Sequence, residues 1–269
     1  MPDRKLSSAL RYSLEVLVTL CMIASGTVAM SAESAAHVPR SGIEYASVDI
    51  RAMQADDFSN PGMLWVSRGE MLWNKPGGVG GKSCATCHQQ ALQTMRGVAT
   101  RYPRMDKLVG RLFNLEGRIN TCREQHQAVP ALTYESEDLL ALTAYVAYQS
   151  RGLPMAIMID GANRTRFESG RQTYIRRQGQ MNLACNHCHD RNAGRRLLAE
   201  VISEGHSNAY PAYRLEWQGL GSLHRRLRAC YFGVRAERPE FGSNELLDLE
   251  LYLARRATGL PVETPGVRR

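Results

Sequence analysis

Two short motifs in this chain carry residues that could hold a redox cofactor. Each has the pattern Cys-x-x-Cys-His, in which two thiols add to the vinyl groups of a haem and the adjacent histidine is placed to ligate its iron. Zinc knuckles or redox Cys-x-x-Cys sites are the alternative, but their cysteine pairs usually lie much closer in sequence than the 101 residues that separate these motifs. The motifs are Cys84-Ala85-Thr86-Cys87-His88 and Cys185-Asn186-His187-Cys188-His189. We therefore predict two covalently bound haem c groups, attached through Cys84, Cys87, Cys185 and Cys188 and ligated by His88 and His189.

The second axial ligand of the second iron cannot be a methionine, which is the usual residue, or a lysine from the chain that follows the second motif. No methionine follows Met181 and no lysine follows Lys107. A six-coordinate haem iron needs a second axial ligand, which small cytochromes usually take from well downstream of the motif. The candidates are Cys230, His206, His224 or an open position.

A lone cysteine follows each motif and gives both irons the same candidate ligand. Cys122 lies 38 residues after Cys84, and Cys230 lies 45 residues after Cys185. The first iron also has methionine candidates, namely Met95, Met105, Met155 and Met158. Because the two cysteines hold equivalent positions, we favour thiolate ligation of both irons by Cys122 and Cys230. A disulfide between these two cysteines is the structural alternative.

The elements around the motifs repeat as well. Amphipathic helices are predicted before each motif, over Trp65–Trp73 and Phe167–Tyr174. After each lone cysteine a second helix is predicted, with Ser136 or Ser243 as its N-cap and a Gly-Leu-Pro stop. These two closing segments match at a constant offset of 107 residues.

This arrangement predicts an all-α fold of two tandem cytochrome c-like domains related by an internal repeat. The first domain is expected over residues 45–155 with the first haem, and the second over 156–269 with the second haem. We expect residues 33–44 to be a loose leader and the proline-rich residues 261–269 to be a tail. No stretch alternates at a period of two for long enough to predict a sheet.

The N-terminus predicts export. Residues 1–32 combine a basic start, an apolar run from Leu14 to Ile23 and small residues near Ala32, which is the layout of a signal peptide. Cys21 lies in this segment and is expected to be removed with the signal peptide. The apolar run is shorter than the roughly 20 residues that span a bilayer, so a retained anchor is the lesser alternative, and no later stretch is apolar enough to span one. We therefore expect a periplasmic protein without a membrane span in its mature chain.

The positive charge of the chain is carried almost wholly by arginine. The formal net charge is +8, and all but four of the 34 Lys and Arg residues are arginine. The lack of a nucleic-acid motif and the predicted export both argue against nucleic-acid binding as the reason for this charge. Planar guanidinium groups suit sulfur or phosphorus oxyanions and acidic protein partners instead, although a solvated basic surface would explain many of these arginines.

Two segments resemble a known family. Tyr210–Arg214 and Leu223–Phe232, with the dihaem spacing and the Gly-Leu-Pro ends, resemble the A subunit of SoxAX, a cytochrome of the bacterial thiosulfate-oxidising Sox system. The resemblance covers essentially the whole mature chain. It implies an L-cysteine S-thiosulfotransferase that works with a monohaem SoxX partner and links thiosulfate to a cysteine of the SoxYZ carrier, with two electrons leaving.

The resemblance also implies roles for single residues. Cys230 would be both the distal ligand of the second haem and the catalytic sulfur centre, found as a persulfide, while Cys122 would ligate the first haem. Arg226, four residues before Cys230, corresponds to the family's substrate-binding arginine. If this segment is helical, Arg226 lies one turn before Cys230 on the same face. Nearby cations favour the thiolate form of a cysteine.

Other functions are also open to a chain with these motifs. A periplasmic dihaem electron carrier would need no substrate site of its own. A dihaem peroxidase would keep one iron open for peroxide, which a ligating Cys230 would prevent. A haem-bearing docking or sensor subunit is the third possibility, although the sequence has no appended signalling domain.

Overall fold

The computed structural model describes residues 37–269, and the predicted signal peptide lies outside these residues. The elements of the first half are η1 (Gly42–Tyr45), α2 (Val48–Ala55), α3 (Met63–Asn74), α4 (Cys84–His88), α5 (Ala91–Thr94), η2 (Ala99–Arg101), β1 (Arg104–Asp106), β2 (Arg111–Phe113), α6 (Leu115–Cys122), η3 (Arg123–Gln127) and α7 (Glu137–Tyr148). Those of the second half are α8 (Arg164–Ile175), α9 (Cys185–His189), β3 (Arg196–Leu197), β4 (Glu200–Val201), β5 (Ala212–Arg214), β6 (Gly219–Gly221), α10 (Leu223–Gly233), α11 (Asn244–Arg256) and β7 (Gly266–Arg268).

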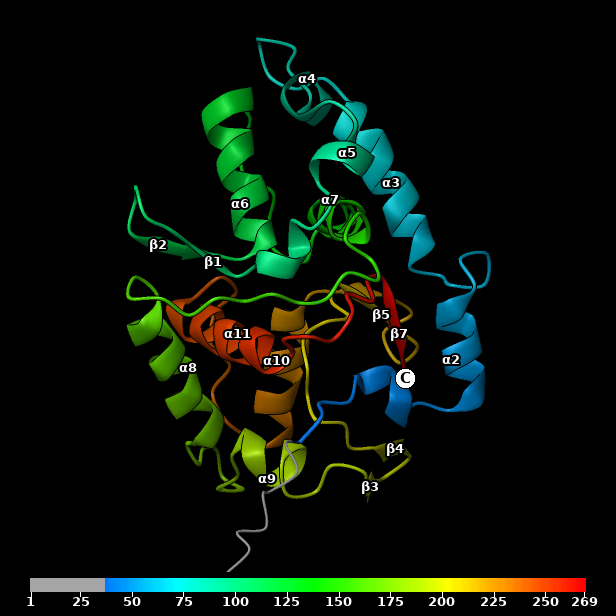
Figure 1. Cartoon of the computed structure of the whole chain (residues 1–269), viewed down its shortest axis with the longest axis vertical. Coiled ribbons are helices and arrows are strands. Elements are labelled where there is room, and N and C mark those ends of the chain that lie inside the picture. Colours follow the sequence, from blue (N-terminus) through cyan, green and yellow to red (C-terminus); the bar gives the residue numbers. More distant parts are fainter. Residues whose placement is uncertain (1–36) are drawn as a thin grey trace, which may run out of the picture. The chain divides into compact units, whose positions relative to one another are not determined.

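The predicted opening and closing helices form and pack in pairs. Helix α3 packs against α7 and α8 packs against α11 (Figure 1). The predicted caps are confirmed, because the hydroxyl of Ser136 accepts from the backbone N–H of Leu139 and that of Ser243 from the N–H of Leu246. Such caps satisfy backbone donors that a helix N-terminus leaves without partners.

Both helix pairs cross at a glycine. A Cβ atom at Gly69 would lie 2.1 Å from the backbone oxygen of Ala141, and one at Gly170 would lie 2.0 Å from that of Asp248. Real Cβ atoms do not approach backbone this closely, so the helices can pack at this distance only because no side chain is present. The two crossings use corresponding positions of the two halves.

Alanine at either crossing is therefore expected to destabilise the protein. Gly69→Ala or Gly170→Ala should each lower the free energy of unfolding by about 2 kcal/mol or more, because the helices must move apart. Urea denaturation of the haem-loaded protein, followed by circular dichroism, measures this. Gly233→Ala is the control, since a Cβ there meets no atom within 4 Å and alanine favours a helix. Equal midpoints for Gly69→Ala and Gly233→Ala would show that the crossing tolerates a side chain.

The two halves share parts of one core. Leu112 of the first half lies in one hydrophobic cluster with Leu247 and Leu251 of α11. Elsewhere the rings of Trp65 and Tyr213 lie 6.0 Å apart across the halves. Residues 39–269 accordingly form one compact unit. The boundary between residues 155 and 156 stays a prediction.

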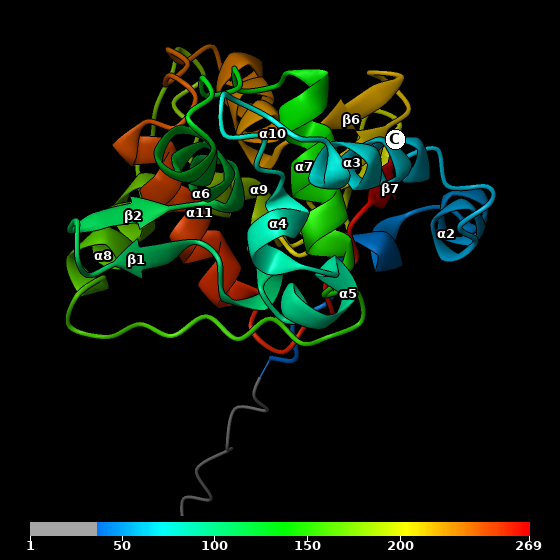
Figure 2. The same cartoon turned by 90° about the horizontal axis from the view of Figure 1, so that it is seen from above.

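Short strands accompany the helices, which the sequence did not predict. The β1–β2 hairpin leads into α6 (Figure 2). In the second half β5 lies between β6, which is antiparallel to it, and β7, which is parallel to it. Each of these three strands has only three residues, too few to display an alternating pattern.

The ends of the described chain are more ordered than predicted. The tail prediction for residues 261–269 is wrong, because Thr264 and Val267 are fully buried and the segment contributes β7 to the sheet. The leader prediction is wrong for residues 39–44, where Ser41 is buried and accepts a hydrogen bond from Asn208. Both expectations came from composition alone, which does not reveal pairing with distant segments.

Candidate active site

Each Cys-x-x-Cys-His motif folds as a single helical turn with its own cap. In α4 the Ser83 hydroxyl accepts from the N–H of Thr86, and the N–H of Ser83 donates to the Thr86 hydroxyl at 3.0 Å. In α9 the ring of His187 takes the place of the threonine, because its Nδ1 accepts from the N–H of Ala184 at 2.9 Å. Cysteines three residues apart on one turn lie on neighbouring positions of the same face. Both motifs are therefore shaped to attach one planar group through two thiols.

The structure brings Cys122 to the first motif. This residue ends α6, and its thiol lies close enough to Cys84 and Cys87 for their charges to interact. Burial raises the pKa of the Cys122 thiol, and the positive charge of Arg118 only partly offsets this. The thiol of Cys122 therefore lies beside the first motif, as ligation of the first iron would require.

Among the alternative ligands of the first iron, only one methionine packs near the motif. Met155 is buried in the core that α11 shares with Leu112, and Met105 packs against that core. Met158 is 80% exposed. Met95, in contrast, packs against the same hydrophobic cluster as Cys84. Cys122 and Met95 therefore both border the first motif, but only the cysteine has a counterpart in the second half.

The lone cysteine at the second motif, Cys230, is influenced by more positive charges than Cys122 is. Helix α10 carries Arg226 one turn before Cys230, as predicted, and the thiol of Cys230 interacts with the ring of His189. Burial by itself raises the pKa of the Cys230 thiol, but the charges of Arg226 and Arg214 and the hydrogen bond with His189 outweigh it and lower the pKa to about 7. The thiol is therefore poised to ionise near neutral pH, unlike that of Cys122.

The other two side-chain candidates for the second iron are each paired with a glutamate. His224 is buried on α10, with its Nε2 2.9 Å from a carboxylate oxygen of Glu250 and its Nδ1 accepting from the N–H of Gly242. His206 lies 3.0 Å from a carboxylate oxygen of Glu204. Of the three side-chain candidates, Cys230 is the one whose side chain is shown in contact with the ring of His189.

The disulfide alternative is wrong. All six cysteines of residues 37–269 are free. Cys122 lies beside the first motif, whereas the charge of Cys230 acts on Cys185 and Cys188 of the second. The two lone cysteines therefore lie at separate sites.

Arg214 is a site residue that the sequence reasoning missed. Its side chain is nearly buried on β5, 2.9 Å from Glu216 and 3.6 Å from Glu200, and its guanidinium lies 5.2 Å from the ring centroid of Trp217. Its charge also lowers the pKa of Cys230. Arg214 was visible in the segment that carried the family resemblance, but only the pairing of β5 with β6, which leads into α10, brings it to this cysteine.

The residues around His189 fit a haem iron ligand. Nδ1 of His189 lies 2.7 Å from the backbone oxygen of Ser203. Because a carbonyl oxygen can only accept, Nδ1 must carry the proton, which leaves the lone pair on Nε2 for a metal. A ligating histidine that donates its other N–H to a carbonyl is the usual arrangement at metal centres.

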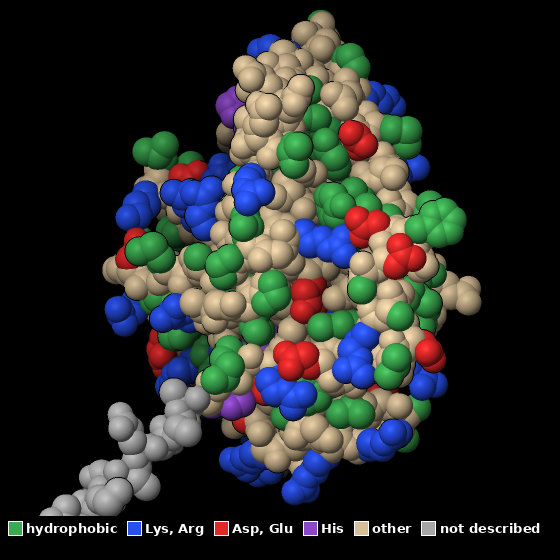
Figure 3. All heavy atoms as spheres, turned by 45° about the vertical axis from the view of Figure 1, so that its right-hand side comes forward, with side chains coloured by type: hydrophobic (Ala, Val, Ile, Leu, Met, Phe, Trp, Pro, Cys, Tyr) green, Lys and Arg blue, Asp and Glu red, His purple; other side chains and the backbone are tan. Residues whose placement is uncertain are grey.

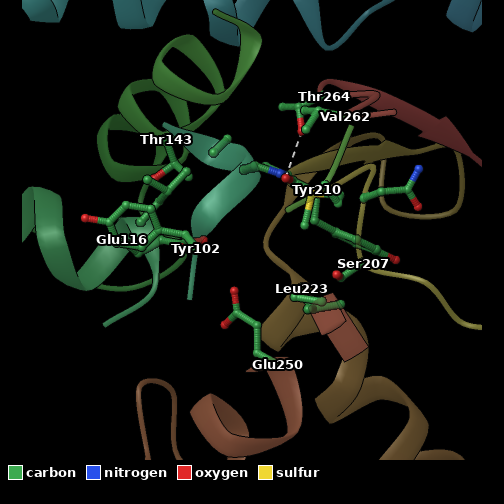
Figure 4. A pocket seen from close by; sticks show the side chains of 15 residues that line it. Tyr102, Glu116, Thr143, Ser207, Tyr210, Leu223, Glu250, Val262 and Thr264 are labelled. Carbon is green, nitrogen blue, oxygen red and sulfur yellow. Dashed lines mark hydrogen bonds between the residues drawn. The ribbon is translucent and has the colours of Figure 1, made fainter. Parts of the chain in front are cut away.

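A separate polar cavity of about 50 Å³ lies between the halves. Glu116 of α6 lines one side and Glu250 of α11 another (Figure 4). The side-chain oxygens of Thr143, Ser207 and Asn208 also reach this region and have no partner within the protein. Ordered water typically satisfies such groups in polar cavities.

The surface does not gather its positive charge on the face shown in Figure 3. There Lys and Arg side chains are separated by acidic and neutral ones. Among the described residues, no helix is long and apolar enough to cross a membrane.

Comparison with known proteins gives consistent similarities. Residues 68–155 match the family described as SoxA/TsdA, cytochrome c domain. The chain is 40% identical over 230 residues to the L-cysteine S-thiosulfotransferase subunit SoxA of Pseudaminobacter salicylatoxidans, covering 85% of this chain and 80% of that protein. It is 37% identical to the subunit of the same name from Rhodovulum sulfidophilum, again covering 85% and 80%.

The fold agrees with a solved structure. The crystal structure of SoxXA from P. pantotrophus superposes with a TM-score of 0.83 at 35% identity, covering 86% of this chain and 87% of that one. Both the sequence and the fold are thus similar over most of the chain. It follows that the chain belongs to the SoxA family of L-cysteine S-thiosulfotransferase subunits, and that it carries a cytochrome c domain of the haem c type.

Proposed function

We propose that this chain joins thiosulfate oxidatively to a cysteine of a SoxYZ-like carrier protein, with Cys230 as the sulfur centre. One observation carries the proposal: Cys230 lies beside His189, and the positive charges of Arg226 and Arg214 act on its thiol and favour the thiolate. A plain electron carrier or a peroxidase would need no such cysteine. The family membership of the chain also favours sulfur transfer over both.

We further propose two haem c groups in two tandem halves, over residues 45–155 and 156–269. The first would be attached at Cys84 and Cys87 and the second at Cys185 and Cys188. His88 with Cys122 would hold the first iron, and His189 with Cys230 would hold the second. The matched glycine crossings and the matched helix caps support this duplicated arrangement.

The proposed reaction removes two electrons and one proton. The carrier thiol loses its proton, its sulfur forms a bond to the terminal sulfur of thiosulfate, and two electrons leave the pair. Cys230 would hold the thiosulfate between two steps: its sulfur first bonds to the terminal sulfur of thiosulfate as the two electrons leave, and the carrier thiolate then attacks that sulfur, takes the whole S–SO3 group and releases the Cys230 thiolate. Haem, when bound, supplies a one-electron acceptor. The lowered pKa of Cys230 supplies a thiolate, which is the nucleophilic form of cysteine.

Arginine side chains would bind the substrate. Arg226 is one turn from Cys230 on α10, and the charge of Cys230 raises the pKa of its guanidinium, which therefore stays protonated. A guanidinium can donate paired hydrogen bonds to a sulfonate group of thiosulfate. Burial near the thiol strengthens such contacts compared with those at an exposed arginine.

The partners and location are proposed from the family. The solved relative is SoxXA from P. pantotrophus, so we propose a SoxX-like monohaem cytochrome as the partner subunit and the next electron acceptor. The periplasm is the proposed location, since residues 1–32 have the pattern of a signal peptide.

The proposal is tested by comparing two arginines of one helix. Arg226→Met is expected to raise the KM for thiosulfate by about 10- to 100-fold, since a lost charged hydrogen bond costs about 1.5–3 kcal/mol. Arg225→Met is the matched control, because the Arg225 guanidinium lies over the ring of Trp217 at 4.3 Å. Steady-state assays with partner and carrier measure both. If Arg226→Met keeps the wild-type KM, the proposed substrate site is wrong.

A further inference from the structure

The loop after β4 holds the second motif's histidine from two sides. The backbone oxygen of Ser203 accepts from Nδ1 of His189 at 2.7 Å. Two residues later, Gly205 packs directly on the imidazole ring: a Cβ there would lie 2.9 Å from both Cγ and Nδ1 of His189. Gly205 also has a φ of +73°, which side-chain-bearing residues rarely adopt. The loop therefore leaves the ring little freedom to rotate or shift.

This loop is anchored by a buried carboxylate between Ser203 and Gly205. Glu204 is only 5% exposed. It accepts from the backbone N–H of Arg40 at 3.1 Å and from the Tyr45 hydroxyl at 2.9 Å, and it lies 3.0 Å from Nε2 of His206. Arg40 and Tyr45 precede Glu204 by 164 and 159 residues. The N-terminal segment Arg40–Tyr45 thus clamps the loop that contacts His189.

A loop held in this way affects both the orientation and the electron donation of an imidazole that binds a metal. A hydrogen bond from Nδ1–H to a carbonyl increases the electron density that Nε2 donates, and it fixes the ring plane. Stronger donation stabilises the oxidised metal and lowers its reduction potential. Weakening this hydrogen bond should therefore raise the potential.

We infer that the Ser203–His206 loop, anchored through Glu204 to Arg40–Tyr45, is a positioning device that orients His189 and lowers the reduction potential of the second haem. This inference rests on the proposed attachment of that haem to the second motif. Gly205 and Glu204 act through His189, so they are positioning residues and not catalytic ones. Residues 40–44 of this segment, which composition suggested were part of a loose leader, thus take part in tuning the redox centre.

The first test replaces two glycines of similar backbone conformation. Gly205→Ala should displace His189, change the electron paramagnetic resonance g-values of one low-spin haem and raise its reduction potential. We expect a shift of about tenfold in the reduction equilibrium, or about 59 mV for one electron. Gly194→Ala is the matched control, because Gly194 has a φ of +83° and a Cβ there would meet no atom within 4 Å. It should leave both haems as in the wild type.

A second pair of variants tests the hydrogen bond between Tyr45 and Glu204 without introducing steric strain. Tyr45→Phe removes the hydroxyl that donates to Glu204 and should shift the same haem in the same direction, by less. Tyr148→Phe removes a comparable hydrogen bond to Asp57, at 2.9 Å, and should shift neither haem. Redox titrations of the haem-loaded protein, monitored by paramagnetic resonance, provide the measurement for both pairs.

The outcomes separate this inference from the proposed function. Two covalent haems in the mass of the protein, with g-values and potentials unchanged in both Gly205→Ala and Tyr45→Phe, would overturn the inference alone. A wild-type mass with one haem, attached at the first motif, would overturn the inference together with the proposed second haem. A shift confined to one haem in both variants, absent from both controls, would support it.

Discussion

Cys230→Ala is expected to remove thiosulfate-dependent turnover, with kcat falling by about a thousandfold or more, as is usual when an enzyme loses its nucleophile. The reason is that the proposed reaction needs a thiolate sulfur beside a one-electron acceptor. The positive charges of Arg226 and Arg214 favour the thiolate form of Cys230. Turnover is measured with thiosulfate, the carrier and the partner subunit present.

The control is the equivalent cysteine of the first half. Cys122→Ala should keep turnover within about tenfold of the wild type, because burial raises the pKa of the Cys122 thiol and the charge of Arg118 only partly offsets this. The electron paramagnetic resonance spectrum of each variant should then lack the signal of one thiolate-ligated haem. Wild-type turnover in Cys230→Ala would show that Cys230 is not the sulfur centre and would move the sulfur chemistry to another residue.

What the sequence predicts well here is local. The Cys-x-x-Cys-His motifs, the serine caps and the helical periodicity all depend on residues within a few positions of one another. The helix over Leu223–Gly233 is such a case, and it was enough to place Arg226 one turn before Cys230. Local patterns of this kind are set by hydrogen bonds and steric preferences that neighbouring residues determine.

What the sequence did not predict depends on long-range pairing. Arg214 reaches the Cys230 site through the β5–β6 pairing, and β5 is completed by β7 from the C-terminal end. Glu204 is held by Arg40 and Tyr45, far away in the chain. Strands of three residues and single clamped carboxylates leave no periodic signal, so one sequence alone could not reveal them.

The burial of Glu116 is another feature that the sequence did not predict. It leads us to expect an unusual pH dependence of stability. Glu116 is 7% exposed and lines the cavity between the halves. Burial, followed by the negative charge of Glu250, raises its pKa to about 8, although the nearby His224 opposes this. The folded protein therefore keeps a proton on Glu116 at neutral pH.

The sign of the effect follows from proton binding. Between pH 4.5, the ordinary pKa of the group, and about 8, Glu116 is ionised in the unfolded chain but protonated in the folded one. The folded state then binds more protons, so this group lowers the free energy of unfolding as pH rises, by up to about 1.4 kcal/mol per pH unit. Above pH 8 the folded protein must hold the buried charge, and the loss of stability is complete.

Glu116→Gln removes the ionisable group and should therefore flatten this decline. We expect the variant to be more stable than the wild type at pH 8, by on the order of 3 kcal/mol, and to differ much less from it at pH 5. Urea denaturation of the haem-loaded protein between pH 5 and 8 measures the difference. Glu70→Gln, on the exposed surface of α3, is the control and should run parallel to the wild type. If Glu116→Gln also runs parallel to the wild type, Glu116 is already ionised in the folded protein at neutral pH, and the buried pair with Glu250 must be neutralised in another way, such as by a proton on His224.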